Sequence, residues 1–185
     1  MNPEREKYRK LWGEHPVYRK VAPGEMFAAH FLNMAKPGPD DTVYDFGCGT
    51  GRGAAKIAER CRVVGFDFTD NSRDPDVVGK FEFRQHDLTR PIDLPPAELG
   101  FCTDVLEHIP PEDVKLVLQN IFQASERVYL NISTVEDSCG ALIGEQLHLT
   151  VRPLNWWLLL TISVGLEVQF AQDIGNSCLI YGRAR

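Results

Sequence analysis

Val43-Tyr44-Asp45-Phe46-Gly47-Cys48-Gly49-Thr50-Gly51 is the stretch of this 185-residue chain that decides its fold. An apolar segment that suits a buried strand runs directly into a glycine-rich turn, and a helix-forming segment over 54–60 follows. Glycine lets the backbone turn sharply and leaves room for a ligand, while the amides that open the helix point to the same place. The stretch therefore predicts a nucleotide-binding turn between a strand and a helix.

Strands and helices alternate along the rest of the chain. The apolar patterns predict strands over 42–46, 62–66, 81–84, 99–103, 127–132, 167–172 and 178–183. They predict helices over 4–13, 24–36, 54–60, 112–125 and 154–164. Residues 69–79 are polar and few, so we expect a loop with at most one helical turn there. The last two strands are joined too tightly for a helical crossover and are expected to be antiparallel.

This order of elements indicates an α/β fold. The expected architecture is a Rossmann-like, doubly wound, seven-stranded and mostly parallel sheet with an antiparallel last strand and helices on both faces. The length fits one domain, so we expect a single domain over 1–185, with a helical N-terminal segment over 1–36 and the Rossmann-like core over 40–185.

Charge and composition bear on partners and location. The net charge is −6, and the basic residues near the N-terminus alternate with acidic ones, which favours a small-molecule partner over nucleic acid. No segment is long and apolar enough to span a bilayer, and the N-terminus lacks the pattern of a signal peptide. The five cysteines are scattered without CxxC spacing, so we expect reduced thiols and a cytoplasmic protein. The sequence says nothing of the oligomeric state.

Three aspartates end successive predicted strands. Asp45 ends the first, Asp67 the second and Asp87 the third. In a doubly wound sheet the ligand lies beyond the carboxyl ends of the strands, so the three carboxylates should meet at one edge. Asp67 lies where a carboxylate can bind ribose hydroxyls, and Asp87 where one can accept a hydrogen bond from an adenine amino group.

These motifs resemble those of class I S-adenosylmethionine-dependent methyltransferases. The glycine turn resembles the first motif of the family, and Val64–Asp67, Asp87-Leu88 and Thr103–Ile109 match later motifs in order. The resemblance implies S-adenosylmethionine as cofactor, S-adenosylhomocysteine as product and methyl transfer as the activity. It implies cofactor-binding roles for Asp45, Gly47, Cys48, Gly49, Gly51, Asp67, Phe68, Asp87, Leu88 and Thr103.

Two other functions remain open. The chain could be an accessory protein that holds S-adenosylmethionine without catalysis, because no motif for the acceptor is visible. An NAD-dependent enzyme on the same fold is a further alternative, but the turn lacks the glycine spacing of the dinucleotide fingerprint. We therefore favour a methyltransferase that acts on the oxygen or nitrogen of a small molecule.

Two candidate catalytic residues, Glu107 and His108, follow the fourth predicted strand, and a third, His148, lies beyond the fifth. Each of them could accept a proton from the acceptor. Asp104, Glu107 and His108 also form a run that resembles the metal-binding run of some O-methyltransferases, and His148 could supply a fourth ligand. Carboxylates with imidazoles suit a divalent cation. In other family members, however, the same glutamate and histidine cap the following helix. We favour this second interpretation, and no metal is predicted.

Segments outside the core should wall the site. In enzymes that resemble this chain, an N-terminal segment closes over the cofactor, so 1–36 is expected to act as a lid, with Tyr18 or Arg19 near the methionine carboxylate. The loop 134–152 would form the opposite wall and leave room for a small methyl acceptor.

Overall fold

The computed structural model describes residues 3–185. Its α-helices are α1 (Pro3–Glu14), α2 (Pro23–Ala35), α3 (Arg52–Ile57), α4 (Pro111–Gln123) and α5 (Leu154–Ser163). Its strands are β1 (Thr42–Phe46), β2 (Arg62–Asp67), β3 (Glu82–Gln85), β4 (Ala97–Thr103), β5 (Ser125–Ser133), β6 (Leu166–Asp173) and β7 (Ser177–Ala184). Short 3₁₀ turns are η1 (Tyr18–Lys20), η2 (Pro75–Val77), η3 (Leu106–His108) and η4 (Cys139–Leu142).

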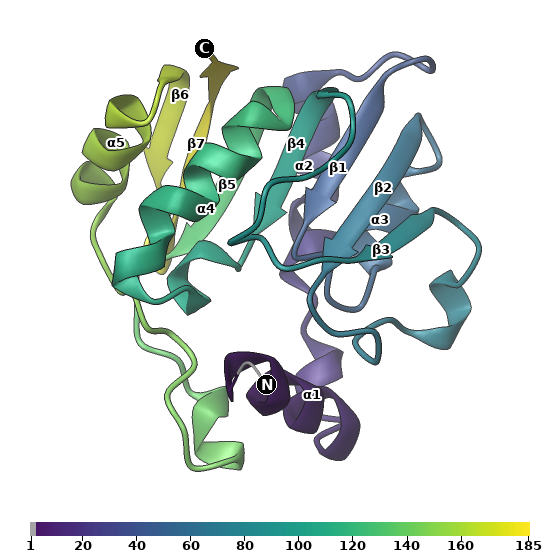
Figure 1. Cartoon of the computed structure of the whole chain (residues 1–185), viewed down its shortest axis with the longest axis vertical. Helices are drawn as coiled ribbons and strands as arrows, with labels where there is room; N and C mark the ends of the chain where they lie inside the picture. Colours follow the sequence, from purple (N-terminus) through teal and green to yellow (C-terminus); the bar gives the residue numbers. More distant parts are fainter. Residues whose placement is uncertain (1–2) are drawn as a thin grey trace.

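One seven-stranded sheet runs through the molecule in the order β3-β2-β1-β4-β5-β7-β6 (Figure 1). β1 to β5 pair in parallel, whereas β7 is antiparallel to both of its neighbours, β5 and β6. The expected fold class is confirmed, including the antiparallel last strand. The polar link after β2 holds only the 3₁₀ turn η2, as its composition predicts.

Helices cover both faces of the sheet because side chains alternate along each strand. On one face Tyr44 and Phe46 of β1 pack under α4 and α5, and on the other Val43 packs under α2 and α3. In Figure 1, α4 and α5 lie in front of the sheet and α2 and α3 behind it. The tryptophan pair in α5 belongs to this packing, since Trp157 is fully buried.

The carboxyl edge of the parallel strands is the edge at which a ligand of this fold is expected. From β1 the chain goes to β2 and β3 on one side, and β4 and β5 continue on the other, so the strand order reverses between β1 and β4. α1 lies under this edge, beside the loop that carries η4 (Figure 1). Tyr8, Leu11 and Leu147 form a small third cluster between them. No helix within residues 3–185 is long and apolar enough to cross a membrane.

Candidate active site

A cavity of about 640 Å³ lies at the carboxyl edge, between the glycine turn, α1 and the loop that follows β5. Its volume is in the range of small-molecule sites, about 300–1,000 Å³. The predicted cofactor residues that line it are Asp45, Gly47, Cys48, Gly49, Asp67, Phe68, Asp87, Leu88 and Thr103. Gly51 is the one predicted cofactor residue that does not.

The glycine turn takes its shape from left-handed backbone. Gly47 and Gly51 have φ of 76° and 74°, a region that side chains disfavour. A Cβ on Gly47 would also collide with Val105, and one on Gly51 would stand 2.8 Å from the ring of Phe81. Gly47 therefore lets the turn pack closely against Val105, whereas Gly51 lets α3 begin against the core.

Asp67 is held in place by the turn itself. Its Oδ2 accepts a hydrogen bond from the Gly49 N–H at 3.0 Å, and its Oδ1 accepts two from Thr69, from the backbone N–H and from Oγ1, both at 2.9 Å. Burial raises the pKa of Asp67, and these hydrogen bonds oppose the rise. The carboxylate is thus fixed at the end of β2 and faces the cavity.

Asp45 is buried without such partners. Burial, with the charge of Asp67 adding to it, raises the pKa of Asp45 to about 8. Cys48 lies beside both carboxylates, and burial raises the pKa of its thiol well above the ordinary value. A thiol kept protonated is a poor nucleophile, which supports a packing role for Cys48.

The far end of the cavity is apolar with one carboxylate. Leu88 is buried, and Asp87 accepts hydrogen bonds from the N–H and Oγ1 of Thr89 at 3.0 and 2.8 Å. The ring of Phe68 lies across from that of Tyr8, with the centroids 5.6 Å apart. A flat ring system with a polar edge would fit this end.

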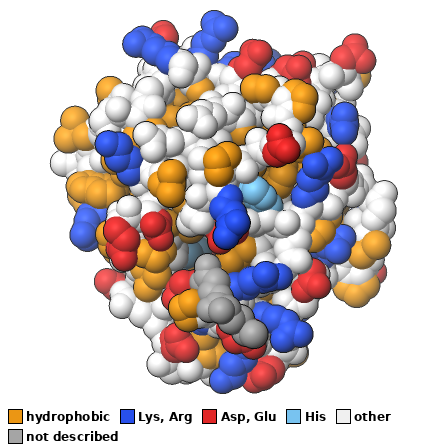
Figure 2. Space-filling model, in the orientation of Figure 1, with side chains coloured by type: hydrophobic (Ala, Val, Ile, Leu, Met, Phe, Trp, Pro, Cys, Tyr) orange, Lys and Arg blue, Asp and Glu red, His pale blue; other side chains and the backbone are white. Residues whose placement is uncertain are grey.

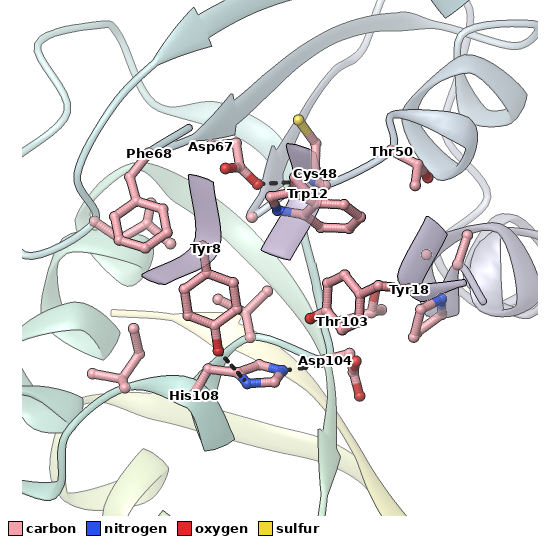
Figure 3. Close-up of a pocket in the computed structure, with 18 of the residues that line it drawn as sticks. Tyr8, Trp12, Tyr18, Cys48, Thr50, Asp67, Phe68, Thr103, Asp104 and His108 are labelled. Carbon is pink, nitrogen blue, oxygen red and sulfur yellow. Dashed lines mark hydrogen bonds and ion pairs between the residues drawn. The ribbon is translucent and has the colours of Figure 1, made fainter. Parts of the chain in front are cut away.

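Aromatic side chains from the N-terminal segment close the cavity from below. Tyr8 and Trp12 of α1 and Tyr18 of η1 point into it, towards the turn and the ends of β2 and β4 (Figure 3). The Trp12 ring lies 3.5 Å from the place that a Cβ on Gly49 would take. The geometry of 3–36 fits the lid that the sequence predicts, and residues 1 and 2 lie outside the described residues.

Arg19 does not face the cavity. Its guanidinium binds the loop after β2, through the carbonyl oxygens of Asn71 and Ser72 and an ion pair with Asp74 at 3.2 Å. Of the two residues predicted to lie near a methionine carboxylate, only Tyr18 lines the cavity. Arg19 instead ties the N-terminal segment to the core.

Asp104, Glu107, His108 and His148 converge beside the cofactor residues. One ligand atom of each lies within 4.8 Å of the others. Asp104, His108 and His148 line the cavity, whereas Glu107 stands behind them and is fully buried. The structure thus brings together the three predicted catalytic residues, although Glu107 has no open path to an acceptor.

Helix capping by Glu107 and His108, the interpretation that the sequence favoured, is wrong. α4 begins at Pro111 and no side chain caps its first turn. Oε1 of Glu107 instead accepts a hydrogen bond from the Ser133 N–H of β5 at 2.6 Å. Nδ1 of His108 contacts the Tyr8 hydroxyl at 2.7 Å and the Leu147 carbonyl at 3.1 Å. Both side chains are therefore held by long-range partners.

The charges of this group are coupled. Burial raises the pKa of Glu107 to about 8, and the nearby Asp104 adds to the rise. Burial opposes the ionisation of Asp104 too, but His108 outweighs it and holds the pKa of Asp104 below its usual value. Burial lowers the pKa of His108, but the negative charges of Asp104 and Glu107 raise it by more. The net shift of the His108 pKa is therefore upward.

Tyr8 is the functional candidate that sequence reasoning missed. It lies 100 positions before His108 along the chain, and no spacing or motif marks it. Burial raises the pKa of its phenol, so the hydroxyl stays protonated and can bind the histidine. Only the placement of α1 under the sheet brings the two together.

The cavity is acidic. Among the described residues that line it, none is a lysine or an arginine, while Asp45, Asp67, Asp87 and Asp104 all contribute to the wall. Outside it, basic and acidic side chains are interspersed over the face shown in Figure 2. Such a cavity suits a cationic ligand and disfavours phosphates.

Comparison with known proteins places this site in a family. Residues 18–170 match the sequence profile described as "Methyltransferase domain". No curated protein sequence matches the chain significantly. The family match includes the glycine turn, the strand-end aspartates and the run from Asp104 to His108.

Solved structures with the same fold hold the cofactor or its product. DhpI in complex with S-adenosylhomocysteine is 16% identical, with a TM-score of 0.75 over 98% of this chain and 95% of that one. Magnesium protoporphyrin IX methyltransferase from Synechocystis PCC 6803, with bound S-adenosylmethionine, is 14% identical, with a TM-score of 0.72 over 98% and 97%.

A third structure is the 1,6-didemethyltoxoflavin-N1-methyltransferase of Burkholderia thailandensis with S-adenosylhomocysteine. It is 14% identical, with a TM-score of 0.77 over 97% of this chain and 86% of that one. At such identities the likeness concerns the fold, and the sequence profile carries the assignment. The chain belongs to the methyltransferase-domain family, the class I S-adenosylmethionine-dependent methyltransferases that its motifs resemble.

Proposed function

We propose that this protein transfers the methyl group of S-adenosylmethionine to an oxygen or nitrogen atom of a small molecule. The observation that carries the proposal is the composition of the cavity at the carboxyl edge. It joins the glycine turn and the strand-end aspartates to the His108–His148 group, under the aromatic side chains of α1 and η1. Cofactor and acceptor would therefore meet in one enclosed space.

The cofactor half follows from the geometry of the wall. The ammonium group would lie at Asp45, the ribose at Asp67 and the adenine between Phe68 and the Asp87-Leu88 edge, with the sulfonium near Thr103. A sulfonium and an ammonium are cations, and a wall with six aspartates and no lysine or arginine among the described lining residues suits them. The same wall argues against NAD, whose pyrophosphate would have no cationic partner.

The acceptor half lies on the side of His108, His148 and the loop after β5. The space is walled by α1, Ile109 and Cys139 on one side and by polar side chains on the other, and an enclosed cavity of this volume suits a small organic acceptor better than a polymer. The structural relatives named for protoporphyrin and didemethyltoxoflavin support this class of acceptor. The rim also exposes apolar side chains, with Val17 58% and Val21 62% exposed.

Methyl transfer is a displacement at an activated carbon. The cavity would contribute by aligning acceptor and sulfonium and by excluding water when the N-terminal segment, the proposed lid, is closed. If the acceptor has to lose a proton, His108 and His148 are the bases with access to it. Glu107, buried behind His108, would raise the basicity of His108 through its charge.

Turnover of cofactor labelled in the methyl group tests the proposal. The protein is incubated with a panel of small hydroxyl- and amine-bearing compounds, and labelled product and S-adenosylhomocysteine are measured together. Gly47→Ala should abolish turnover and cofactor binding, because a side chain there collides with Val105. Gly79→Ala is the matched control, since Gly79 also has positive φ but has nothing within 4 Å. Tight binding without turnover of any compound would instead indicate an accessory protein that only holds the cofactor.

A further inference from the structure

We propose that Asp104, Glu107, His108 and His148 bind a divalent cation, and that this cation holds a hydroxyl oxygen of the acceptor beside the methyl group. The inference rests on the proposed methyl transfer and narrows it to an oxygen acceptor. Four potential ligand atoms, two from carboxylates and two from imidazoles, lie within 4.8 Å of one another. That spread is of the size that ligands about 2.0–2.3 Å from a single ion would span.

Backbone hydrogen bonds set this convergence. The carbonyl of Glu107 accepts hydrogen bonds from the N–H groups of Leu149 and Thr150 at 2.7 and 2.9 Å. The segment after β5 is thereby fastened to η3, and His148 is brought next to His108 with ring centroids 4.8 Å apart. His148, the fourth side chain of the group, is therefore positioned by backbone hydrogen bonds of the residues that follow it.

Both imidazoles are oriented as metal ligands usually are. Nδ1 of His148 lies 2.7 Å from the Val135 carbonyl, and Nδ1 of His108 lies 3.1 Å from the Leu147 carbonyl. A carbonyl oxygen can only accept, so Nδ1 of His148 carries the proton and its Nε2 keeps a free lone pair. Nδ1 of His108 also contacts the Tyr8 hydroxyl at 2.7 Å, and this hydroxyl accepts a hydrogen bond in the tautomer that leaves Nε2 of His108 free for an ion. A hydrogen bond from the other ring nitrogen to a carbonyl is the arrangement that fixes a metal-binding histidine.

The buried carboxylate lacks a partner. Glu107 is fully buried and its Oε1 is bound to the Ser133 N–H, but its Oε2 has no hydrogen-bond partner although it is inaccessible to solvent. A buried carboxylate oxygen is almost always hydrogen-bonded or bound to a cation. This unpaired oxygen is an observation independent of the clustering, and it too indicates a cation.

Asp104 adds a strained backbone to the same place. Its φ is 58°, which is uncommon for a residue with a side chain and is often kept at functional sites. Its Oδ2 lies 3.8 Å from Nε2 of His108, too far for a hydrogen bond. At this distance the two groups are within ion-pair range of each other.

Charge and donor type indicate the class of ion. Metal binding takes the ionised form of a carboxylate and the neutral form of an imidazole and releases any proton held there. In these forms the four side chains carry a net charge of −2, which a divalent ion would balance. The mixed nitrogen and oxygen donors suit Mn²⁺, Fe²⁺ or Zn²⁺ better than Ca²⁺ or Mg²⁺. Asp104, His108 and His148 line the cavity, so the remaining positions of the ion would face the acceptor.

The cation would assist one defined step. With His108 and His148 bound to the ion, neither acts as a base. Binding to the ion acidifies the acceptor hydroxyl, whose O–H bond breaks; the proton leaves to water and the oxygen keeps the electron pair. That oxygen bonds to the methyl carbon as the carbon–sulfur bond breaks, and the electron pair of this bond stays on sulfur. The products are the methyl ether or ester, S-adenosylhomocysteine and one proton, and the ion keeps its charge.

Calorimetry with Mn²⁺ on the chelator-dialysed full-length protein tests the site. We expect one ion per chain, and Asp104→Asn and Glu107→Gln should each weaken its binding at least about tenfold. Both changes keep the shape: asparagine tolerates positive φ, and glutamine can still accept from Ser133. His15→Ala is the matched control, since His15 lies outside the cavity. Pulsed electron paramagnetic resonance of bound Mn²⁺ should show two imidazole nitrogens, and His148→Gln should remove one.

Binding of S-adenosylhomocysteine by the same variants separates the two proposals. The metal site is supported if Asp104→Asn and Glu107→Gln lose Mn²⁺ binding while their affinity for S-adenosylhomocysteine stays within twofold of the wild type. No Mn²⁺ binding by the wild type, or binding that the variants do not weaken, overturns it and leaves the methyltransferase proposal intact. Absence of cofactor binding by the wild type would overturn the proposed function itself. Undiminished turnover in excess chelator would overturn the role of the ion in the reaction.

Discussion

Replacing Asp67 by asparagine should weaken cofactor binding by an amount that the hydrogen bonds of this residue set. A carboxylate offers about four acceptor positions. Three are occupied, one by the Gly49 N–H and two by Thr69. One position therefore remains for the cofactor, and Asp67 should bind a single ribose hydroxyl rather than both.

The size of the effect follows from that count. A hydrogen bond to a charged group contributes about 1.5–3 kcal/mol, and each 1.4 kcal/mol changes an equilibrium constant about tenfold. Asp67→Asn should therefore raise the Kd for S-adenosylhomocysteine by about 10- to 150-fold. In the wild type, only one of the 2′-deoxy and 3′-deoxy analogues should bind that much more weakly, and the variant should no longer distinguish them.

Isothermal titration calorimetry of the wild type and the variant with S-adenosylhomocysteine and its 2′-deoxy and 3′-deoxy analogues measures these affinities. Thermal unfolding checks that the variant is folded. Asp70→Asn is the control, because Asp70 loses the same charge nearby but is exposed and lies outside the cavity wall. A variant that binds within twofold of the wild type would refute the placement of the ribose. Equal losses for both deoxy analogues in the wild type would refute the single remaining position.

Three further outcomes are expected. Because burial raises the pKa of Asp45 to about 8, binding of the cofactor ammonium should release a proton from Asp45. The affinity for the cofactor should therefore rise from pH 6 towards pH 8, by at most about tenfold per pH unit. Asp45→Asn should remove this pH dependence in binding titrations across that range. Tyr8→Phe removes the 2.7 Å contact with His108 and should speed cofactor release about 2- to 12-fold in stopped-flow measurements, whereas an unchanged rate would mean that this contact does not hold α1 closed. Trp157→Ala should lower the free energy of unfolding by about 3–5 kcal/mol in urea titrations, while Leu159→Ala on the exposed face of α5 should change it by less than about 0.5 kcal/mol; similar values for the two would contradict the packing of α5.

The sequence predicts what local patterns encode. The strand ends are visible because apolar residues stop where the chain leaves the sheet, and Asp45, Asp67 and Asp87 stand at those places. Parallel strands share one carboxyl edge, so their meeting in a single cavity follows from the fold class alone. The antiparallel pairing of β6 and β7 follows in the same way from the short turn between them.

What the sequence does not show depends on contacts between distant segments. Tyr8 reaches His108 only because α1 lies under the sheet, and Arg19 binds the loop after β2 rather than facing the cavity. Glu107 looks like a helix cap in the sequence because it precedes α4, but its partner is Ser133 of the neighbouring strand. Gly51 belongs to the motif, but its role is in packing, because the ring of Phe81, a residue distant along the chain, leaves no room for a side chain there.

A crystal structure of the protein with S-adenosylhomocysteine tests the central claim most directly. The account predicts the ligand in the 640 Å³ cavity, with its ribose at Asp67, its adenine against Phe68 and its sulfur beside Thr103, facing the side of His108. A ligand bound elsewhere, or one whose sulfur points away from His108 and His148, would contradict it.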